Sequence, residues 1–236
     1  MAAVTLLAAR GLTRHFGGLK AVDAVDFDLR QGEIHALIGP NGAGKSTFVS
    51  LLSGRVPLQS GTISFAGQDI THLPAHARVR RGIAYTFQIT SIYPRLTVFD
   101  NVGLAVQSHG SRDPAADVRS ALVRVGLAGR ETTPAGVLSY GHQRLLELAM
   151  GLALRPKLLI LDEPTQGLAL AEIEQFKSLM RGLIPATTVL LIEHNIEVVM
   201  DLAHRISVLN LGTRLALGTP AEIRANAAVQ AAYLGG

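Results

Sequence analysis

A glycine-rich segment carries the strongest chemical signal of the chain. Residues 39–47 read Gly-Pro-Asn-Gly-Ala-Gly-Lys-Ser-Thr and fit the pattern GxxxxGK[ST], between an apolar run and an apolar helical pattern. The glycines let successive N–H groups face inward, and a helix beginning near Lys45 adds its positive dipole end. This predicts an oligophosphate site rather than an empty turn, with Lys45 at the outer phosphates and Ser46 beside magnesium. The candidate phosphate-binding residues are Gly39, Asn41, Gly42, Gly44, Lys45, Ser46 and Thr47.

Two adjacent carboxylates follow a second apolar run. Residues 158–161 are Leu-Leu-Ile-Leu, and Asp162 and Glu163 come next. Successive side chains of a strand point to opposite sides, so the two acids are expected to have different roles. We assign Asp162 to magnesium and Glu163 to an attacking water, as P-loop enzymes require. The alternative is a surface pair held in salt bridges.

Two further segments could take part in the same chemistry. A third apolar run, residues 189–192, is followed by Glu193 and His194, which places His194 at the same sheet edge. A histidine there is, by itself, more often structural. Ser139 and Gly141 precede a predicted helix over 144–154 and offer a hydroxyl and N–H groups to an anion. A second anion site makes sense if it serves a nucleotide held by another copy.

The elements that must position these residues can be read from the apolar spacing. Apolar and polar residues alternate at 25–29 and 62–65, which predicts half-buried antiparallel strands, whereas the continuous runs predict parallel strands covered by helices. Helical spacing recurs at 118–125, 145–152 and 173–180, and Thr219, Pro220 and Glu222 form a capping box. Glycines at 54, 126 and 182 are the predicted helix stops. The fold class is therefore α/β with a parallel sheet, whose ligands bind at the carboxyl ends of the strands.

The amino-acid composition excludes several kinds of site and partner. The 236 residues are 48% apolar and include no cysteine, so thiolate metal sites and disulfides are excluded. The net charge of +4 is small, and the one dense basic cluster, residues 76–81, is explained as well by a solvated helix face, so we expect no nucleic acid partner. No apolar run is long enough to cross a bilayer, and the first ten residues lack a secretory pattern, which favours the cytoplasm.

Taken together, these segments resemble the ATP-binding cassette family, the ATPase subunits of ABC transporters, over essentially the whole chain. The residues 138–143, Leu-Ser-Tyr-Gly-His-Gln, distinguish this family among P-loop proteins. The resemblance implies a single cassette domain over 1–236 with a P-loop NTPase (RecA-like) core. The core with its N-terminal antiparallel β subdomain would span about 1–85 and 156–236, and a helical signature subdomain about 86–155.

The resemblance also implies roles for individual residues. Gln88 matches a glutamine that touches magnesium and faces the membrane subunit, and His194 matches a sensor of the γ-phosphate. Phe16 lies where an aromatic ring stacks on adenine, although an ordinary core aromatic is the alternative. ATP and Mg²⁺ are the implied cofactors. Two cassettes, as a homodimer or a heterodimer, would enclose each ATP between one phosphate loop and the opposite Ser139 and Gly141.

Within the family, the chain is most similar to the ATPase subunits of branched-chain amino-acid importers. The segments that carry this likeness include residues 16–20, 82–88, 94–98, 193–195 and 232–235. The implied partners are transmembrane permease subunits and a periplasmic or extracellular solute-binding protein, with the ATPase on the inner face of the cell membrane. Cassettes for urea or other amides, lipopolysaccharide exporters and soluble non-transport ABC proteins are the alternatives. Two departures, His142 and Ala169, replace polar residues that the family usually has there.

Overall fold

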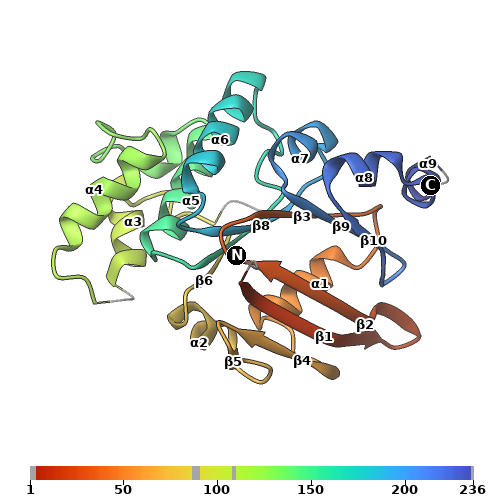
Figure 1. Cartoon of the computed structure of the whole chain (residues 1–236). Coiled ribbons are helices and arrows are strands. Elements are labelled where there is room, and N and C mark those ends of the chain that lie inside the picture. The colour runs from red at the N-terminus through yellow and green to blue at the C-terminus, as the bar shows by residue number, and fades with distance from the viewer. Residues whose placement is uncertain (1–3, 87–90, 108–109, 235–236) are drawn as a thin grey trace.

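The computed structural model describes residues 4–86, 91–107 and 110–234, and its largest sheet has six strands (Figure 1). The strand order is β10-β9-β3-β8-β7-β6, in which β10 runs antiparallel to β9 and the other neighbours are parallel. The strand bounds are β3 Ile34–Ile38, β6 Ile83–Thr86, β7 Leu158–Asp162, β8 Thr188–Ile192, β9 Arg205–Asn210 and β10 Thr213–Gly218. The three continuous apolar runs are β3, β7 and β8, each buried along its whole length. The α/β class with a parallel sheet is thus confirmed.

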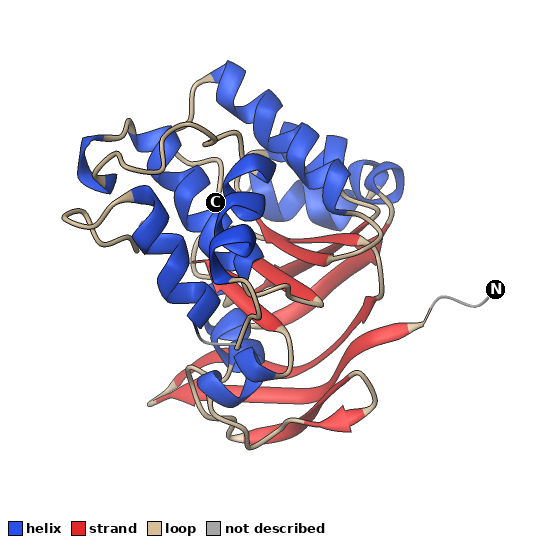
Figure 2. Ribbon diagram, turned by 90° about the vertical axis from the view of Figure 1, so that its left-hand side faces the viewer, coloured by secondary structure: helices blue, strands red, loops and turns tan. Residues whose placement is uncertain are grey.

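A second sheet of four strands is antiparallel, as the alternating pattern predicted. Its order is β2-β1-β4-β5, with bounds β1 Thr5–Phe16, β2 Leu19–Arg30, β4 Ser60–Phe65 and β5 Gln68–Asp69. Figure 2 shows this sheet as a separate layer below the six-stranded sheet. Its buried side chains pack with α1, Lys45–Ser53, against one face of the parallel sheet.

The remaining helices, apart from α2, lie on the other side of the parallel sheet, where α3 and α4 pack onto α5. They are α3 Val98–Gln107, α4 Pro114–Arg124, α5 Tyr140–Ala153, α6 Leu170–Leu183, α7 Ile196–Leu202, α8 Pro220–Ala225 and α9 Ala227–Leu234. The short helix α2, Ala75–Arg80, and a 3-10 turn over Ala135–Val137 complete the elements. The helices α1 and α5 lie on opposite sides of the sheet (Figure 1). The side chains of β3, β7 and β8 alternate between the two faces, so each strand packs against both layers. The division into a core and a helical part, about 86–155, stays a prediction.

Helix ends agree with the sequence in part. Gly54, with φ +74°, directly follows α1, and Gly126, with φ +76°, comes after Val125, the residue that caps α4. The capping box at Thr219 opens α8. The predicted stop at Gly182 is wrong, because α6 continues to Leu183. The residue before a proline is biased away from helical angles, so Ile184, which precedes Pro185, is extended and the helix ends at Leu183.

Two other local predictions need correction. The helix predicted over 144–154 begins at Tyr140, because the Ser139 side chain caps it by accepting the His142 N–H. In the basic cluster, Arg78 is only 2% exposed and does not belong to a solvated face. Its guanidinium donates to the carbonyls of Leu51 and Leu52 at 2.8 Å and so closes the end of α1. Burial lowers the pKa of Arg78 to about 10.

Within the described parts of the chain, no helix combines the length and the apolar character that crossing a membrane would require.

Candidate nucleotide site

The glycine-rich segment joins β3 to α1 at the carboxyl edge of the parallel sheet, where the sequence placed it. Gly44 caps the helix with φ +98°, and a Cβ there would lie 2.1 Å from the Ala21 carbonyl oxygen. At Gly39 a Cβ would lie 2.2 Å from the carbonyl oxygen of Leu209. Larger residues at these two positions would therefore displace the loop from the strands beside it.

Lys45 turns its side chain back into this loop. Its Nζ donates to the Gly39 and Pro40 carbonyls at 2.7 and 3.1 Å, and only 7% of the residue is exposed. Burial lowers the pKa of Lys45, and the charges of Glu163 and Asp162 act against that shift. The ammonium thus lies close to both acids and, among the described residues, bonds only to backbone carbonyls. A buried ammonium group whose hydrogen bonds go to neutral carbonyls is well suited to bind an anionic ligand.

Asp162 ends β7 with its side chain buried, 5% exposed. Its Oδ2 accepts a hydrogen bond from the Tyr85 hydroxyl at 2.6 Å. Burial raises the pKa of Asp162, while Tyr85 and the charge of Lys45 act in the opposite direction. Sequence reasoning missed Tyr85, and its position at the end of β6, the neighbour of β7, is the signal that could have identified it.

Glu163 has a different environment from the adjacent Asp162. Its backbone adopts φ +50°, and its N–H donates to the Ile192 carbonyl of β8 at 2.8 Å. This conformation aims the side chain at His194, whose Nε2 lies 2.6 Å from Glu163 Oε1. The His194 side chain is 45% exposed and the Glu163 side chain 12%, so solvent reaches this pair mainly at the histidine. The structure thus brings together Lys45, Asp162, Glu163 and His194 from three strand ends.

The remaining residues predicted at this site differ in their exposure to solvent. Gln88 lies outside the described residues. Ser46 and Asn41 are exposed, and Thr47 is partly buried, at the start of α1 and in the loop before it. Phe16 is 47% exposed with Arg14 stacked 4.9 Å from its ring centre, so it is not a core aromatic. The site assignments themselves remain predictions.

The predicted second anion site lies at the start of α5. Ser139 is exposed, and Gly141 is in the first turn, where backbone N–H groups lack helical acceptors. The departure His142 places Nδ1 2.7 Å from the Ser139 hydroxyl oxygen. At the departure Ala169, the Glu172 carboxylate accepts the backbone N–H at 2.9 Å and also packs over Gly141.

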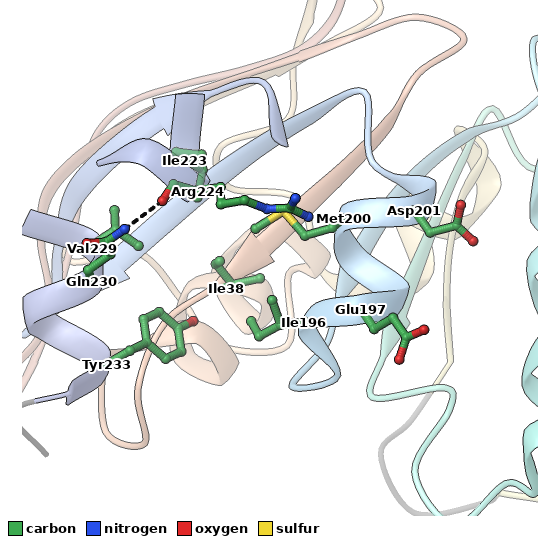
Figure 3. Close-up of a pocket in the computed structure, with 10 residues that line it drawn as sticks. All are labelled: Ile38, Ile196, Glu197, Met200, Asp201, Ile223, Arg224, Val229, Gln230 and Tyr233. Atoms are coloured by element: carbon green, nitrogen blue, oxygen red, sulfur yellow. Dashed lines mark hydrogen bonds between the residues drawn. The ribbon is translucent and has the colours of Figure 1, made fainter. Parts of the chain in front are cut away.

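A cavity of about 750 Å³ lies beside the glycine-rich segment, between α7 and the C-terminal helices (Figure 3). Its wall is mainly apolar and includes Ile38, Ile196, Met200 and Tyr233. Burial raises the pKa of Tyr233 to about 12, and a hydrogen bond with the Gly39 backbone acts in the opposite direction. The C-terminal helix therefore contacts the glycine-rich segment at Gly39, whereas Asp162, Glu163 and His194 do not line this cavity.

Comparisons with known families agree with this geometry. A family model described as "ABC transporter" matches residues 22–166, more than half of the chain. A second, described as "Branched-chain amino acid ATP-binding cassette transporter", matches residues 213–236. The residues matched by the two family models thus include the glycine-rich segment, Asp162, Glu163 and the C-terminal helices.

Individual relatives and solved structures extend the likeness to the whole chain. The high-affinity branched-chain amino acid transport ATP-binding protein LivG of Salmonella typhimurium is 39% identical, and BraF of Pseudomonas aeruginosa, with the same description, is 36% identical. Each alignment covers 98% of this chain and 98% of the relative. A nucleotide-free ATP-binding cassette from an ABC transporter has 25% identity and a TM-score of 0.86, over 99% of this chain and all of that one. A cassette in its ADP conformation, 24% identical over the same shares of the two chains, has the same fold with a TM-score of 0.88.

Proposed function

Because this chain belongs to the ABC transporter family, whose cassettes are ATPases, we propose that it binds and hydrolyses ATP to power the import of branched-chain or similar amino acids. One observation carries the chemical part: a buried lysine in a phosphate-binding loop lies beside two acids and a histidine at one sheet edge. The solute class rests on the likeness to LivG and BraF over nearly the full chain.

The proposed chemistry divides between the two acids. Glu163 acts as general base toward the water that attacks the γ-phosphorus, and the attack breaks the bond to the ADP oxygen and yields ADP and phosphate. His194, beside Glu163, orients that carboxylate and contacts the γ-phosphate. Lys45 leaves its carbonyl partners to contact the outer phosphates, and the N–H groups of the loop contact the rest.

Magnesium fits the donor set that the chain presents. Asp162 is a buried carboxylate, and Ser46 supplies a hydroxyl oxygen at the start of α1. Gln88 is proposed as a third ligand. Among the described residues, no group of three or more His, Asp or Glu side chains could hold a metal ion alone, so phosphate oxygens would complete the shell. Magnesium, when bound there, supplies positive charge that stabilises the transferring phosphoryl group.

We further propose that two cassettes close on ATP and that permease subunits couple this closure to transport. Ser139 and Gly141 lie on α5, across the sheet from α1, which supports their serving a nucleotide held by a second cassette. We propose that the permease docks on the segment around residues 88–101, in which Tyr93 is 56% exposed and Ile92 packs partly into the core. The solute-binding protein and the position on the inner face of the cell membrane belong to the same proposal.

The test uses the full chain, alone and with its membrane partners. We expect magnesium-dependent phosphate release from ATP by the purified protein. We also expect ATP-driven uptake of radiolabelled leucine, isoleucine or valine when it is reconstituted with its permease and solute-binding protein. Absence of phosphate release in both preparations would contradict the ATPase assignment. Hydrolysis stimulated by a different solute would contradict only the amino-acid assignment.

A further inference from the structure

Glu193 is a buried acid directly before His194, and the proposed chemistry does not use it. The residue is 3% exposed and follows the last residue of β8. Its Oε1 accepts the backbone N–H of Thr165 at 2.8 Å and the hydroxyl of Thr165 at 2.5 Å. Its Oε2 accepts the backbone N–H groups of His194 and Asn195 at 3.0 and 3.1 Å. One carboxylate thus accepts four hydrogen bonds.

The identity of these partners distinguishes Glu193 from an ordinary structural acid. Burying a carboxylate is costly unless it is fully hydrogen-bonded, and an apolar residue often stabilises a fold equally well at such a position. No Lys or Arg lies within ion-pair distance of Glu193 in the described part of the chain. Every donor instead belongs to one of two loops: the loop that follows Glu163 and the loop that carries His194.

Two contacts join the loop of Glu163 to the end of β8, next to the reacting groups. The Glu163 N–H donates to the carbonyl of Ile192, the last residue of β8. Glu193, the next residue, binds Thr165, two residues after Glu163. The Glu163 and His194 side chains, which these two segments carry, lie 2.6 Å apart.

We infer that Glu193 is a positioning residue, which holds the loops of Glu163 and His194 at the separation that ATP hydrolysis requires. The inference rests on the proposed ATPase function. Thr165 is its partner, and the hydroxyl of Thr165 is the part of this link that a side-chain substitution can remove. Because a small displacement of reacting groups can cost about a hundredfold in rate, loss of the link should slow turnover more than it weakens ATP binding.

The test compares two buried threonines. Thr165→Val keeps the shape and the backbone N–H but removes the hydroxyl donor. Thr187→Val is the matched control, because Thr187 is 6% exposed, against 5% for Thr165, and directly precedes β8, at the end of the strand away from Glu193. We expect Thr165→Val and Glu193→Gln to lower kcat by about tenfold to a hundredfold, with ATP affinity within about twofold of wild type. Thr165→Ser should restore most of the rate, and Thr187→Val should leave it unchanged.

A double-mutant cycle with His194→Ala separates positioning from general stability. If Glu193 acts through the His194 and Glu163 pair, Thr165→Val should cost less than about twofold further in the His194→Ala background. The same fold loss in both backgrounds would overturn the inference, as would an unchanged kcat in Thr165→Val or a parallel loss of ATP affinity. Should Glu193→Gln fail to fold, the Thr165 variants still decide the matter. A wild-type chain without ATPase activity would instead refute the proposed function.

Discussion

At the scale of single residues, adjacent acids are placed in different environments. Asp162 continues the strand geometry of β7, is buried, and bonds to Tyr85. Glu163 leaves the strand with φ +50° and meets His194. A left-handed backbone is unfavourable for a non-glycine residue, so surrounding contacts such as the bond to Ile192 must hold it. This difference supports separate roles for the two side chains.

The role of Glu163 leads to a test of the chemical step. Glu163→Gln keeps the size of the side chain but removes the base, so hydrolysis should fall by about 10² to 10⁴ fold. ATP affinity should change little, because the phosphate loop is intact. Phosphate release and equilibrium ATP binding check the two parts. Glu197→Gln, at an exposed acid on α7, is the control and should hydrolyse ATP normally.

A substitution of Lys45 tests nucleotide binding rather than the hydrolysis step. Lys45→Ala removes a buried cation beside the proposed phosphates, and hydrogen bonds to charged groups contribute about 1.5 to 3 kcal/mol. The ATP dissociation constant should therefore rise by about tenfold to a hundredfold. Titration with a fluorescent ATP analogue measures this change. The control variant Lys157→Ala, at the exposed residue directly before β7, should bind ATP as wild type does. Equal affinity in both variants would count against the phosphate-loop assignment.

At the scale of elements, an ion-pair cluster fixes α7, the helix that follows His194, to α6. Asp201 of α7 pairs with Lys177 at 2.6 Å and with Arg181 at 2.7 Å, both on α6. The hydrogen bond from Lys177 is the main cause that lowers the pKa of Asp201, and Arg181 adds to the effect. Asp201 is 37% exposed, so solvent screens the attraction and the contribution of the cluster stays small.

This cluster gives a pH-dependent prediction. A carboxyl group with a lowered folded pKa stabilises the protein above its usual value near 3.8, and that contribution is lost as the pH falls through the lower folded pKa. Asp201→Asn should therefore reduce the free energy of unfolding by about 1 kcal/mol or less at pH 7. The difference from wild type should shrink as the pH drops below about 4. Denaturant titrations at several pH values measure it, and a difference that grows at acid pH would contradict this reasoning.

At the scale of the whole molecule, the two predicted anion sites lie on helices that cover opposite faces of one sheet. The helix α1 packs with the antiparallel layer, and α5 packs with the helices on the other face. Apolar side chains near the start of α5 and α6 are exposed: Val137 at 73%, Tyr140 at 45% and Leu170 at 83%. Such a patch beside a proposed binding site supports its being covered by a second cassette.

Dimer closure can be tested in a variant that retains ATP. In the Glu163→Gln background, ATP should produce a dimer detectable by light scattering, because bound ATP is not consumed. Adding Ser139→Arg places a bulky side chain at the exposed cap of α5 and should leave the protein monomeric. Thr132→Arg, at an exposed residue that precedes α5 in the sequence, is the control and should still dimerise. A dimer that persists with Ser139→Arg would show that the start of α5 is not in the interface.

The sequence by itself determined the features that depend on short-range spacing. The phosphate-loop pattern, the continuous strands β3, β7 and β8, the helix stop at Gly54 and the capping box at Thr219 are all written within a few neighbouring residues. Local backbone preference and the period of apolar residues are enough to predict them. The family likeness was predictable for the same reason, since its motifs are short.

Only the tertiary structure decided which distant residues meet. Tyr85 and Asp162 are 77 positions apart, and Thr165 and Glu193 are 28 apart, so no local pattern links either pair. The burial of Arg78 likewise depends on where α1 ends against α2, although the other basic residues of its cluster, His76, Arg80 and Arg81, are exposed. Such contacts form because parallel strands bring remote segments to one edge and because buried polar groups must find partners there. Sequence spacing specifies the elements, whereas packing specifies which of their side chains interact.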